Sequence, residues 1–202
     1  MDTPVVSAVV LAAGLSSRME GRHKLLLDAG GMPLIRRTVQ AVLGIAPAET
    51  VVVTGFEAAR VEAALVGLPV RCVHNPRYAE GQPSSVAAGV RALTAFCQAV
   101  MVVPGDMALL TPADLGALIA AYAQADGSIL VPFHHGQRGN PILFAAFHIP
   151  QVTAGGMNIG CRHLIETHAQ EVAQVEFESE AFTFDCDTPS DYAALLARSA
   201  VP

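Results

Sequence analysis

Tryptophan is absent from this 202-residue sequence, and aromatic residues make up only 5% of it. Proteins that bind single-stranded nucleic acid stack the bases on several aromatic side chains, so the composition disfavours this class. Basic residues are also few: the sequence has 12 Lys and Arg against 18 Asp and Glu, which gives it a net charge of −6. Sequence-independent binding of nucleic acid needs an excess of Lys and Arg. We expect no nucleic-acid partner, although a local group of cations could still bind a small anion.

Cysteine pairs and long apolar runs are missing as well. Cys72, Cys97, Cys161 and Cys186 lie far apart and form no C-x-x-C pair, which suggests neither a disulfide framework nor a zinc site. No apolar run approaches the roughly 18 residues of a membrane-spanning helix. Asp2 stands where a signal peptide would carry basic residues. We therefore expect a cytoplasmic protein with no membrane partner.

The chain is rich in short apolar runs instead. Apolar residues make up 52% of the sequence and charged residues 15%, which favours a compact fold, and no linker or repeat divides residues 1–202. Strand-like runs alternate with stretches of helical spacing, which predicts an α/β fold with a mainly parallel sheet and helices on both faces. The expected strands are 5–12, 50–54, 70–74, 99–103, 128–132, 140–147, 172–177 and 182–186. The expected helices are 34–43, 57–65, 84–96, one that begins at 111–114, one near 161–168, and 191–198.

Polar segments follow four of the expected strands: 14–24, 81–85, 104–106 and 185–187. In open α/β sheets, ligands bind outside the carboxyl ends of the strands. One topology would therefore bring all four segments to one edge of the sheet.

The first segment combines small residues with two cations. Gly14, Ser16 and Ser17 allow backbone N–H groups to approach an anion, and Arg18 and Lys24 supply the countercharge. This pattern predicts a polyphosphate site; a tight turn with a solvated Arg and Lys is the alternative. The motif G-x-S-x-R lacks the further glycines of a dinucleotide fingerprint, the G-K-[ST] of a Walker A loop and the last glycine of a nucleophile elbow.

Carboxylates stand in two of the other segments. Asp106 follows a Pro-Gly turn at the end of an apolar strand, where a hard divalent cation would compensate its charge. Mg²⁺ takes one or two carboxylates with phosphate oxygens and water, and Asp187 is the natural second ligand, with Asp185 facing the other way on its strand. The alternative is that Asp106 stabilises a turn and that Asp187 caps the helix after Thr188-Pro189.

The segment 81–85 suits the close approach of a flat base and a ribose, with Gly81 and Ser85 as contacts. Alternatively, Ser84 or Ser85 only caps a helix. The polar turn 138–141 could line a pocket or merely turn the chain. The remaining histidine pairs show no metal-ligand spacing, and we expect core or surface positions for them: His134, His135, His163 and His168.

Four motifs occur in order along the chain: L-A-A-G-L-S-S-R-M at 11–19 with Lys24, G-Q-P-S-S-V at 81–86, P-G-D-M at 104–107, and D-C-D-T-P-S-D-Y at 185–192. Together they resemble those of the molybdenum-cofactor cytidylyltransferases, within the wider molybdopterin-guanylyltransferase-like nucleotidyltransferases. The resemblance covers nearly the whole chain, from about Val6 to Tyr192.

The resemblance implies a Rossmann-like nucleotidyltransferase fold and Mg²⁺-dependent transfer of CMP from CTP to the molybdenum cofactor, through the phosphate of molybdopterin, with release of pyrophosphate. It implies catalytic roles for Arg18, Lys24 and Asp106, and metal contacts for Asp106 and Asp187. Residues 133–180 would form the acceptor side, and a molybdoenzyme or its chaperone would be a transient partner. The nucleotide-binding set that it implies is Leu11, Ala12, Ala13, Gly14, Ser16, Ser17, Arg18, Lys24, Gly81, Ser85 and Asp106.

Three details bear on the substrates. Guanylyltransferase relatives carry L-A-G-G where this chain has Ala13, and a methyl group there would narrow the base pocket and favour CTP over GTP. Glu20 replaces the glycine that usually follows R-M, with Gly21 one position later. The stretch 155–162, expected near the acceptor, lacks the usual acidic G-D-x-G pattern.

Nucleotidyl transfer depends on positioning and charge stabilisation, so it requires no protein nucleophile. Four alternatives stay open at this point. They are the use of GTP, a sugar-phosphate or polyol-phosphate acceptor, an oxidoreductase relative of the same fold, and a non-catalytic carrier that delivers the cofactor to a molybdoenzyme.

Overall fold

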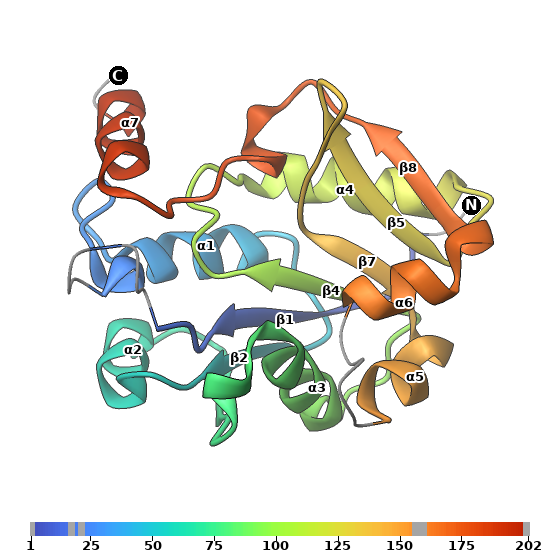
Figure 1. Cartoon of the computed structure of the whole chain (residues 1–202), viewed down its shortest axis with the longest axis horizontal. Coiled ribbons are helices and arrows are strands. Elements are labelled where there is room, and N and C mark those ends of the chain that lie inside the picture. Colours follow the sequence, from blue (N-terminus) through green and yellow to red (C-terminus); the bar gives the residue numbers. More distant parts are fainter. Residues whose placement is uncertain (1–2, 16–18, 20–22, 155–160, 200–202) are drawn as a thin grey trace.

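The computed structural model describes residues 3–15, 19, 23–154 and 161–199. An eight-stranded sheet runs through them in the order β3-β2-β1-β4-β7-β5-β6, with β8 paired to β5 (Figure 1). β3, β2, β1 and β4 are parallel neighbours, and β7 is antiparallel to both β4 and β5. The strands are β1 (Val6–Ala12), β2 (Thr50–Thr54), β3 (Arg71–His74), β4 (Ala99–Pro104), β5 (Ile129–His134), β6 (Gln137–Arg138), β7 (Ile142–Ala145) and β8 (Val172–Glu176).

Helices cover both faces of the sheet (Figure 1). Side chains of α1, α2, α4 and α7 fill the core on one face, and those of α3, α5 and α6 fill the core on the other. This arrangement confirms the expected α/β class with a mainly parallel sheet. No helix in the described ranges is both long and apolar enough to cross a membrane. The helices are α1 (Leu34–Leu43), α2 (Ala58–Leu65), α3 (Gln82–Ala92), α4 (Pro112–Gln124), α5 (Ile149–Thr153), α6 (Cys161–Thr167) and α7 (Pro189–Ser199).

β1 lies at the centre of the parallel part of the sheet, and all of its residues are buried. Val9 and Leu11 face one core, whereas Val10 and Ala12 face the other. A strand that is covered on both faces reads as a continuous apolar run, which is the pattern seen in the sequence. The chain leaves β1 through β2 and β3 on one side and returns on the other side as β4, which creates a crevice at the carboxyl ends of β1 and β4.

Gly89 brings α3 unusually close to the sheet. A Cβ atom at this position would lie 2.3 Å from Cγ1 of Val9 and 2.6 Å from Cγ2 of Val53. Only glycine fits there without displacing β1 or β2, because a dense core has no space to accept a methyl group. The close packing fixes α3 over β1 and β2, so that the N-terminal turn of α3 lies beside the crevice.

The structure differs from the expected elements mainly in the C-terminal half. Residues 182–186 form no strand; a 3-10 turn, η5 (Glu180–Phe182), leads into irregular chain. Phe182, Phe184 and Cys186 alternate as in a strand, but they fill the core beside α7 instead of pairing with a neighbouring strand. β6 and α5 were not expected, and the segments 84–96 and 140–147 are shortened to α3 and β7.

Glu49, just before β2, connects this strand to β3 and to the chain that follows α3. Its carboxylate accepts hydrogen bonds from Nη2 of Arg71 in β3 (2.5 Å) and from the backbone N–H groups of Thr94 (2.7 Å) and Ala95 (3.0 Å) after α3. Burial raises the pKa of Glu49, but these bonds outweigh it and lower the pKa to about 2. The carboxylate therefore stabilises the fold in its charged form.

We predict that Glu49→Gln lowers the free energy of unfolding by about 1–2 kcal/mol at pH 7, a value reduced for the partial exposure of the site. Because the folded pKa is depressed, the contribution is complete above the unfolded value of 4.5 and is lost as the pH falls toward about 2. Urea unfolding of both proteins between pH 7 and pH 3 should show a shrinking difference. Glu166→Gln, in an exposed pair with Arg162, is the control and should cost less than about 0.5 kcal/mol. A difference that is constant with pH would contradict the assignment.

Candidate functional site

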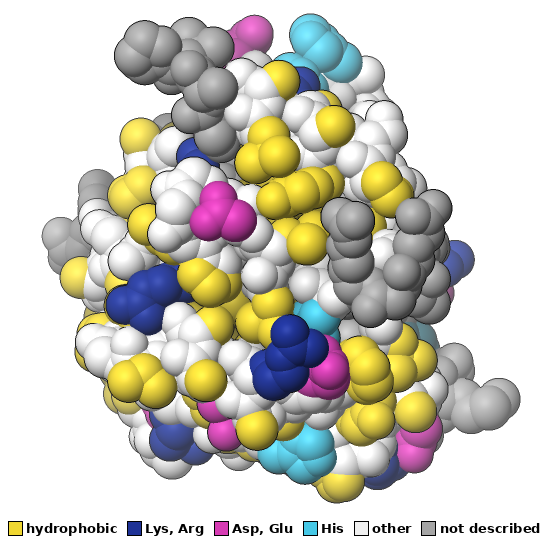
Figure 2. All heavy atoms as spheres, turned by 90° about the vertical axis from the view of Figure 1, so that its left-hand side faces the viewer, with side chains coloured by type: hydrophobic (Ala, Val, Ile, Leu, Met, Phe, Trp, Pro, Cys, Tyr) yellow, Lys and Arg dark blue, Asp and Glu magenta, His cyan; other side chains and the backbone are white. Residues whose placement is uncertain are grey.

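A cavity of about 280 Å³ opens at the carboxyl ends of β1 and β4. Its walls come from the end of β1 and the loop after it, from two 3-10 turns, η1 (Lys24–Leu26) and η2 (Tyr78–Glu80), from the start of α3 and from the turn after β4. Figure 2 shows the side of the molecule toward which β1 and β4 point in Figure 1, where hydrophobic side chains reach the surface between separate groups of basic and acidic side chains. The cavity therefore lies at the edge of the sheet that the sequence predicted.

The turn after β4 is pressed against the end of β1. The N–H of Gly105 donates to the carbonyl oxygen of Leu11 (2.9 Å), and a Cβ atom on Gly105 would lie 2.6 Å from that same oxygen. A glycine is required for this approach. It places the next residue, Asp106, at the cavity wall with only 7% of its surface exposed.

Lys24 joins the two predicted carboxylates. Its Nζ donates to Oδ2 of Asp106 and to Oδ1 of Asp187, the latter at 2.7 Å. Burial lowers the pKa of Lys24, but the two carboxylates outweigh this effect, so the net shift is upward and the ammonium stays charged. Three segments that are remote in sequence thus meet at one cation beside the cavity.

The segment before α7 leaves Asp187 available for Lys24. Oδ2 of Asp191 accepts hydrogen bonds from the N–H groups of Asp187 (3.1 Å) and Thr188 (2.8 Å). The hydroxyl of Thr188 in turn accepts from the N–H of Asp191 (3.2 Å). Thr188 and Asp191 therefore cap α7, as the Thr-Pro motif predicted, and the alternative that Asp187 caps this helix is wrong.

Asp185 belongs to the same charged region. The expectation that it faces away rested on a strand over 182–186, and the structure has no strand there. Burial raises the pKa of Asp185 to about 7, and the charges of Asp106 and Asp187 add to this effect, whereas Lys24 opposes it. Burial, reinforced by the two neighbouring carboxylates, thus disfavours a third negative charge at Asp185.

The same charge distribution suits a hard divalent cation. Asp106 and Asp187 already converge on a cationic group, the ammonium of Lys24. Within the described ranges, no group of three or more His, Cys, Asp or Glu side chains could hold a metal ion. A Mg²⁺ ion here would depend on phosphate oxygens and water for its other ligands, which is its usual mode of binding.

The start of α3 forms another wall of the cavity. Gly81 precedes the helix with φ +103°, and no side chain among the described residues caps this end. The hydroxyl of Ser84 donates back to the carbonyl oxygens of Gly81 and Arg77 (both 2.8 Å). Ser84 and Ser85 are therefore not the caps that the alternative interpretation required.

The cavity contains most, but not all, of the predicted nucleotide contacts. Ala12 is not among the lining residues, because its side chain lies in the core on the face of the sheet that α1 covers. Ser16, Ser17 and Arg18 lie outside the described residues, as do Glu20, Gly21 and the stretch 155–160. The predicted residues that line the cavity are Leu11, Ala13, Gly14, Lys24, Gly81, Ser85 and Asp106.

Several lining residues were not among the predicted nucleotide contacts, although Leu15 and Gln82 lie in the predicted segments 14–24 and 81–85. Tyr78 and Ala79 lie on η2, and Leu15, Leu25 and Gln82 also line the cavity. The dipeptide Asn75-Pro76 is a turn signal that could have predicted a turn between β3 and α3. It gives no indication, however, that this turn forms a wall of a binding site.

The mainly parallel sheet, the crevice at the reversal of strand order and the charged groups around it are typical of an α/β protein that binds a phosphate-bearing ligand. Residues 8–175 match the model of the MobA-like NTP transferase domain, and the chain belongs to this family. The match confirms the resemblance found in the sequence.

Known relatives agree with this assignment. The chain is 31% identical over 201 residues to the molybdenum cofactor cytidylyltransferase of Escherichia coli, with 96% of both proteins covered. It is 32% identical over 132 residues to the bifunctional protein GlmU of Sphingopyxis alaskensis, but spans only 29% of that protein's length. The structure of a nucleotidyl transferase from Methanothermobacter thermautotroptrophicus superposes with a TM-score of 0.82 at 30% identity, over 96% of this chain and 97% of that one.

Proposed function

We propose that this protein transfers CMP from CTP to the phosphate of a molybdopterin-type acceptor, the molybdenum cofactor, and releases pyrophosphate in a Mg²⁺-dependent reaction. The observation that carries the proposal is the meeting of Lys24, Asp106 and Asp187 beside the cavity at the end of β1. The full-length similarity to the cytidylyltransferase of E. coli supports the choice of substrates.

The chain's own residues would act mainly by electrostatic stabilisation of the phosphate groups. Lys24 keeps its proton because two carboxylates face it, so its ammonium can bind phosphate oxygens and stabilise the departing pyrophosphate. Arg18, for which we propose the same role, is outside the described residues. Asp106 and Asp187 would hold Mg²⁺, which neutralises the charge of the triphosphate when it is bound. The acceptor phosphate attacks the α-phosphate of CTP directly, and the fixed cavity supplies the alignment.

The acceptor would enter from residues 133–180. A second cavity, of about 80 Å³, shares Gln82 and Pro104 with the first and is also lined by Arg138, Asn140 and Arg162. The guanidinium of Arg138 suits a phosphate monoester, and that of Arg162, which is exposed and paired with Glu166, would have to exchange this partner for the phosphate. We therefore propose that residues 1–202 act as one nucleotidyltransferase domain with its acceptor side at 133–180. The cytoplasmic location and the contact with a molybdoenzyme or its chaperone stay predictions.

The proposal is tested by pyrophosphate release with CTP and GTP in parallel, with the molybdenum cofactor, a sugar phosphate or a polyol phosphate as acceptor, in the presence of Mg²⁺ or EDTA. We expect turnover with CTP and the molybdenum cofactor that EDTA stops. If turnover is faster with another acceptor or with GTP, that compound is the substrate and the corresponding part of the proposal is wrong. Binding of the cofactor without pyrophosphate release would indicate a carrier, and binding of NAD(P)H or a flavin would favour an oxidoreductase.

Ala13 offers a test of base choice. A Cβ atom on Gly55 would lie 2.8 Å from the Ala13 methyl carbon and 2.6 Å from Cβ of Tyr78, so these residues form a close-packed wall. We predict that Ala13→Gly removes a methyl group from this wall and so widens the base pocket. The GTP-to-CTP ratio of kcat/KM should rise by roughly tenfold, since one methyl group is worth about 1–3 kcal/mol of discrimination.

Pyrophosphate release with both nucleotides measures the effect of Ala13→Gly. Ala8→Gly changes a buried alanine within β1 that does not line the cavity, and it controls for a general loss of packing. A ratio that Ala13→Gly leaves at the wild-type value would refute the role of this methyl group.

A further inference from the structure

Asn75 lies behind the nucleotide cavity and does not line it. It is 3% exposed and stands between β3 and η2. Its N–H donates to the carbonyl oxygen of Thr54 at the end of β2 (2.8 Å), and its own carbonyl oxygen accepts from the N–H of Tyr78 (3.2 Å). The backbone of Asn75 is thereby fixed to the sheet on one side and to η2 on the other.

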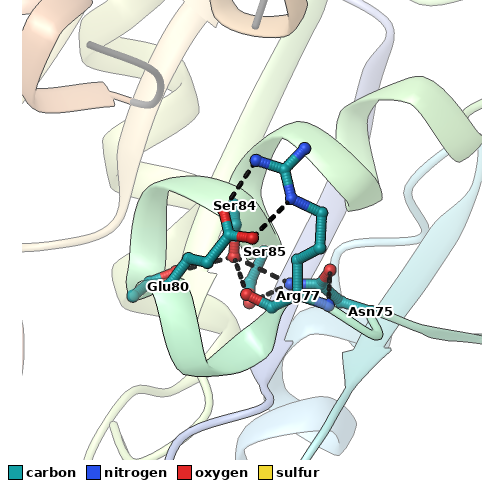
Figure 3. Close-up of polar contacts among 6 residues, drawn as sticks. Asn75, Arg77, Glu80, Ser84 and Ser85 are labelled. Carbon is teal, nitrogen blue, oxygen red and sulfur yellow. Dashed lines mark hydrogen bonds and ion pairs between the residues drawn. The ribbon is translucent and has the colours of Figure 1, made fainter. Parts of the chain in front are cut away.

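The side-chain amide of Asn75 continues this connection to α3 (Figure 3). Nδ2 donates to the hydroxyl oxygens of Ser84 (2.9 Å) and Ser85 (3.0 Å), and Oδ1 accepts from the N–H of Arg77 (3.0 Å). Both amide protons and the amide oxygen are therefore used. A buried polar group that is fully hydrogen-bonded in this way has one orientation, because any rotation would leave donors unpaired.

The groups that Asn75 joins are walls of the cavity. η2 contributes Tyr78 and Ala79, and the start of α3 contributes Gly81 and Ser85. The exposed ion pair between Arg77 and Glu80 spans the same turn, but a pair in water adds little to its rigidity. The buried amide of Asn75 and the hydroxyl of Ser84, which donates to the carbonyl oxygen of Arg77, are thus the buried side-chain connections that the described residues show between the two walls.

We propose that Asn75 is a positioning residue that sets the width of the base pocket and, through it, the preference for a pyrimidine over a purine nucleotide. The inference rests on the proposed function. Without the amide, the hydroxyls of Ser84 and Ser85 lose their shared donor, and within the described residues only the bond from the Ser84 hydroxyl to the carbonyl oxygen of Arg77 still joins the side chains of α3 to the start of η2. With fewer bonds to hold it, η2 with Tyr78 can shift relative to Ser85 on α3, so a pyrimidine binds less tightly and a purine is less strongly excluded.

The test compares Asn75→Ala with the wild-type protein in steady-state kinetics and in titrations of CTP and GTP without acceptor. We expect the KM and Kd for CTP to rise by roughly fivefold to tenfold, as for the loss of a buried hydrogen bond, with kcat within about threefold. The GTP-to-CTP ratio of kcat/KM should rise by a similar factor. Ser84→Ala should show the same changes to a smaller extent, and the double variant should show less than the product of both effects, because the two residues act together.

Arg77→Ala is the matched control. It removes the exposed ion pair of the same turn but keeps the backbone N–H that donates to Asn75, so the KM for CTP should stay at the wild-type value. A purely structural role predicts a lower melting temperature for Asn75→Ala with unchanged KM and base preference, and that result would overturn the proposal. If Asn75→Ala does not fold, an unchanged KM in Ser84→Ala would overturn it equally. Wild-type protein that binds neither nucleotide would instead contradict the proposed function itself.

Discussion

Asp106→Asn should lower the rate of pyrophosphate release by roughly 10²–10³-fold or more, because it removes the carboxylate that we propose to hold Mg²⁺ against the reacting phosphates. The substitution keeps the size and shape of the side chain, so the turn that Gly105 presses against β1 should stay in place. What is lost is the negative charge that faces Lys24 and would bind Mg²⁺. The measurement is single-turnover pyrophosphate release at saturating CTP and Mg²⁺, with thermal unfolding as the check on the fold.

Asp126→Asn is the control for the general effect of losing a carboxylate, since Asp126 is exposed and lies in the loop between α4 and β5. It should leave the rate within about twofold of the wild type. An Asp106→Asn protein that retains wild-type turnover would show that the metal is held elsewhere.

Lys24→Met should have an effect of similar size on turnover for a different reason. The ammonium beside Asp106 and Asp187 would stabilise negative charge on the departing pyrophosphate, and loss of one such group costs roughly 10²–10³-fold in kcat. The substitution also leaves two carboxylates facing each other with Asp185 nearby. We therefore expect a lower melting temperature for the variant, which Mg²⁺ alone should partly restore because the ion replaces the lost positive charge.

The response to Mg²⁺ separates this interpretation from a simple loss of packing. Lys24→Arg retains the charge and should keep the melting temperature closer to the wild-type value, whereas its wider guanidinium cannot replace the compact ammonium in the reaction. A Lys24→Met protein whose melting temperature does not respond to Mg²⁺ would argue against a metal between Asp106 and Asp187.

The fold was largely predictable because β1, β2 and β4 are buried on both faces, and their continuous apolar runs leave little choice of structure. The strand that we predicted at 182–186 is wrong because alternating apolar residues do not by themselves indicate a strand. Phe182, Phe184 and Cys186 alternate for reasons of core packing, and period two alone does not show whether a partner strand is available.

The site was predictable only in part. The residue types at Asp106, Lys24 and Asp187 indicated charge chemistry, but Lys24 is 82 residues from Asp106 and 163 from Asp187, so their contact depends on the tertiary fold. Tyr78 and Asn75 were missed because Asn75-Pro76 signals only a turn, and no motif there indicates a binding site. Their importance arises from the position of η2 against α3, which no local pattern encodes.

A crystal structure of the protein with Mg²⁺ and a non-hydrolysable α,β-methylene analogue of CTP tests the central claim most directly. We predict that the triphosphate occupies the cavity at the end of β1, with Mg²⁺ about 2.0–2.1 Å from a carboxylate oxygen of Asp106 and with Nζ of Lys24 on a phosphate oxygen. A nucleotide bound outside this cavity, or a metal ion with no protein ligand from Asp106 or Asp187, would contradict the account.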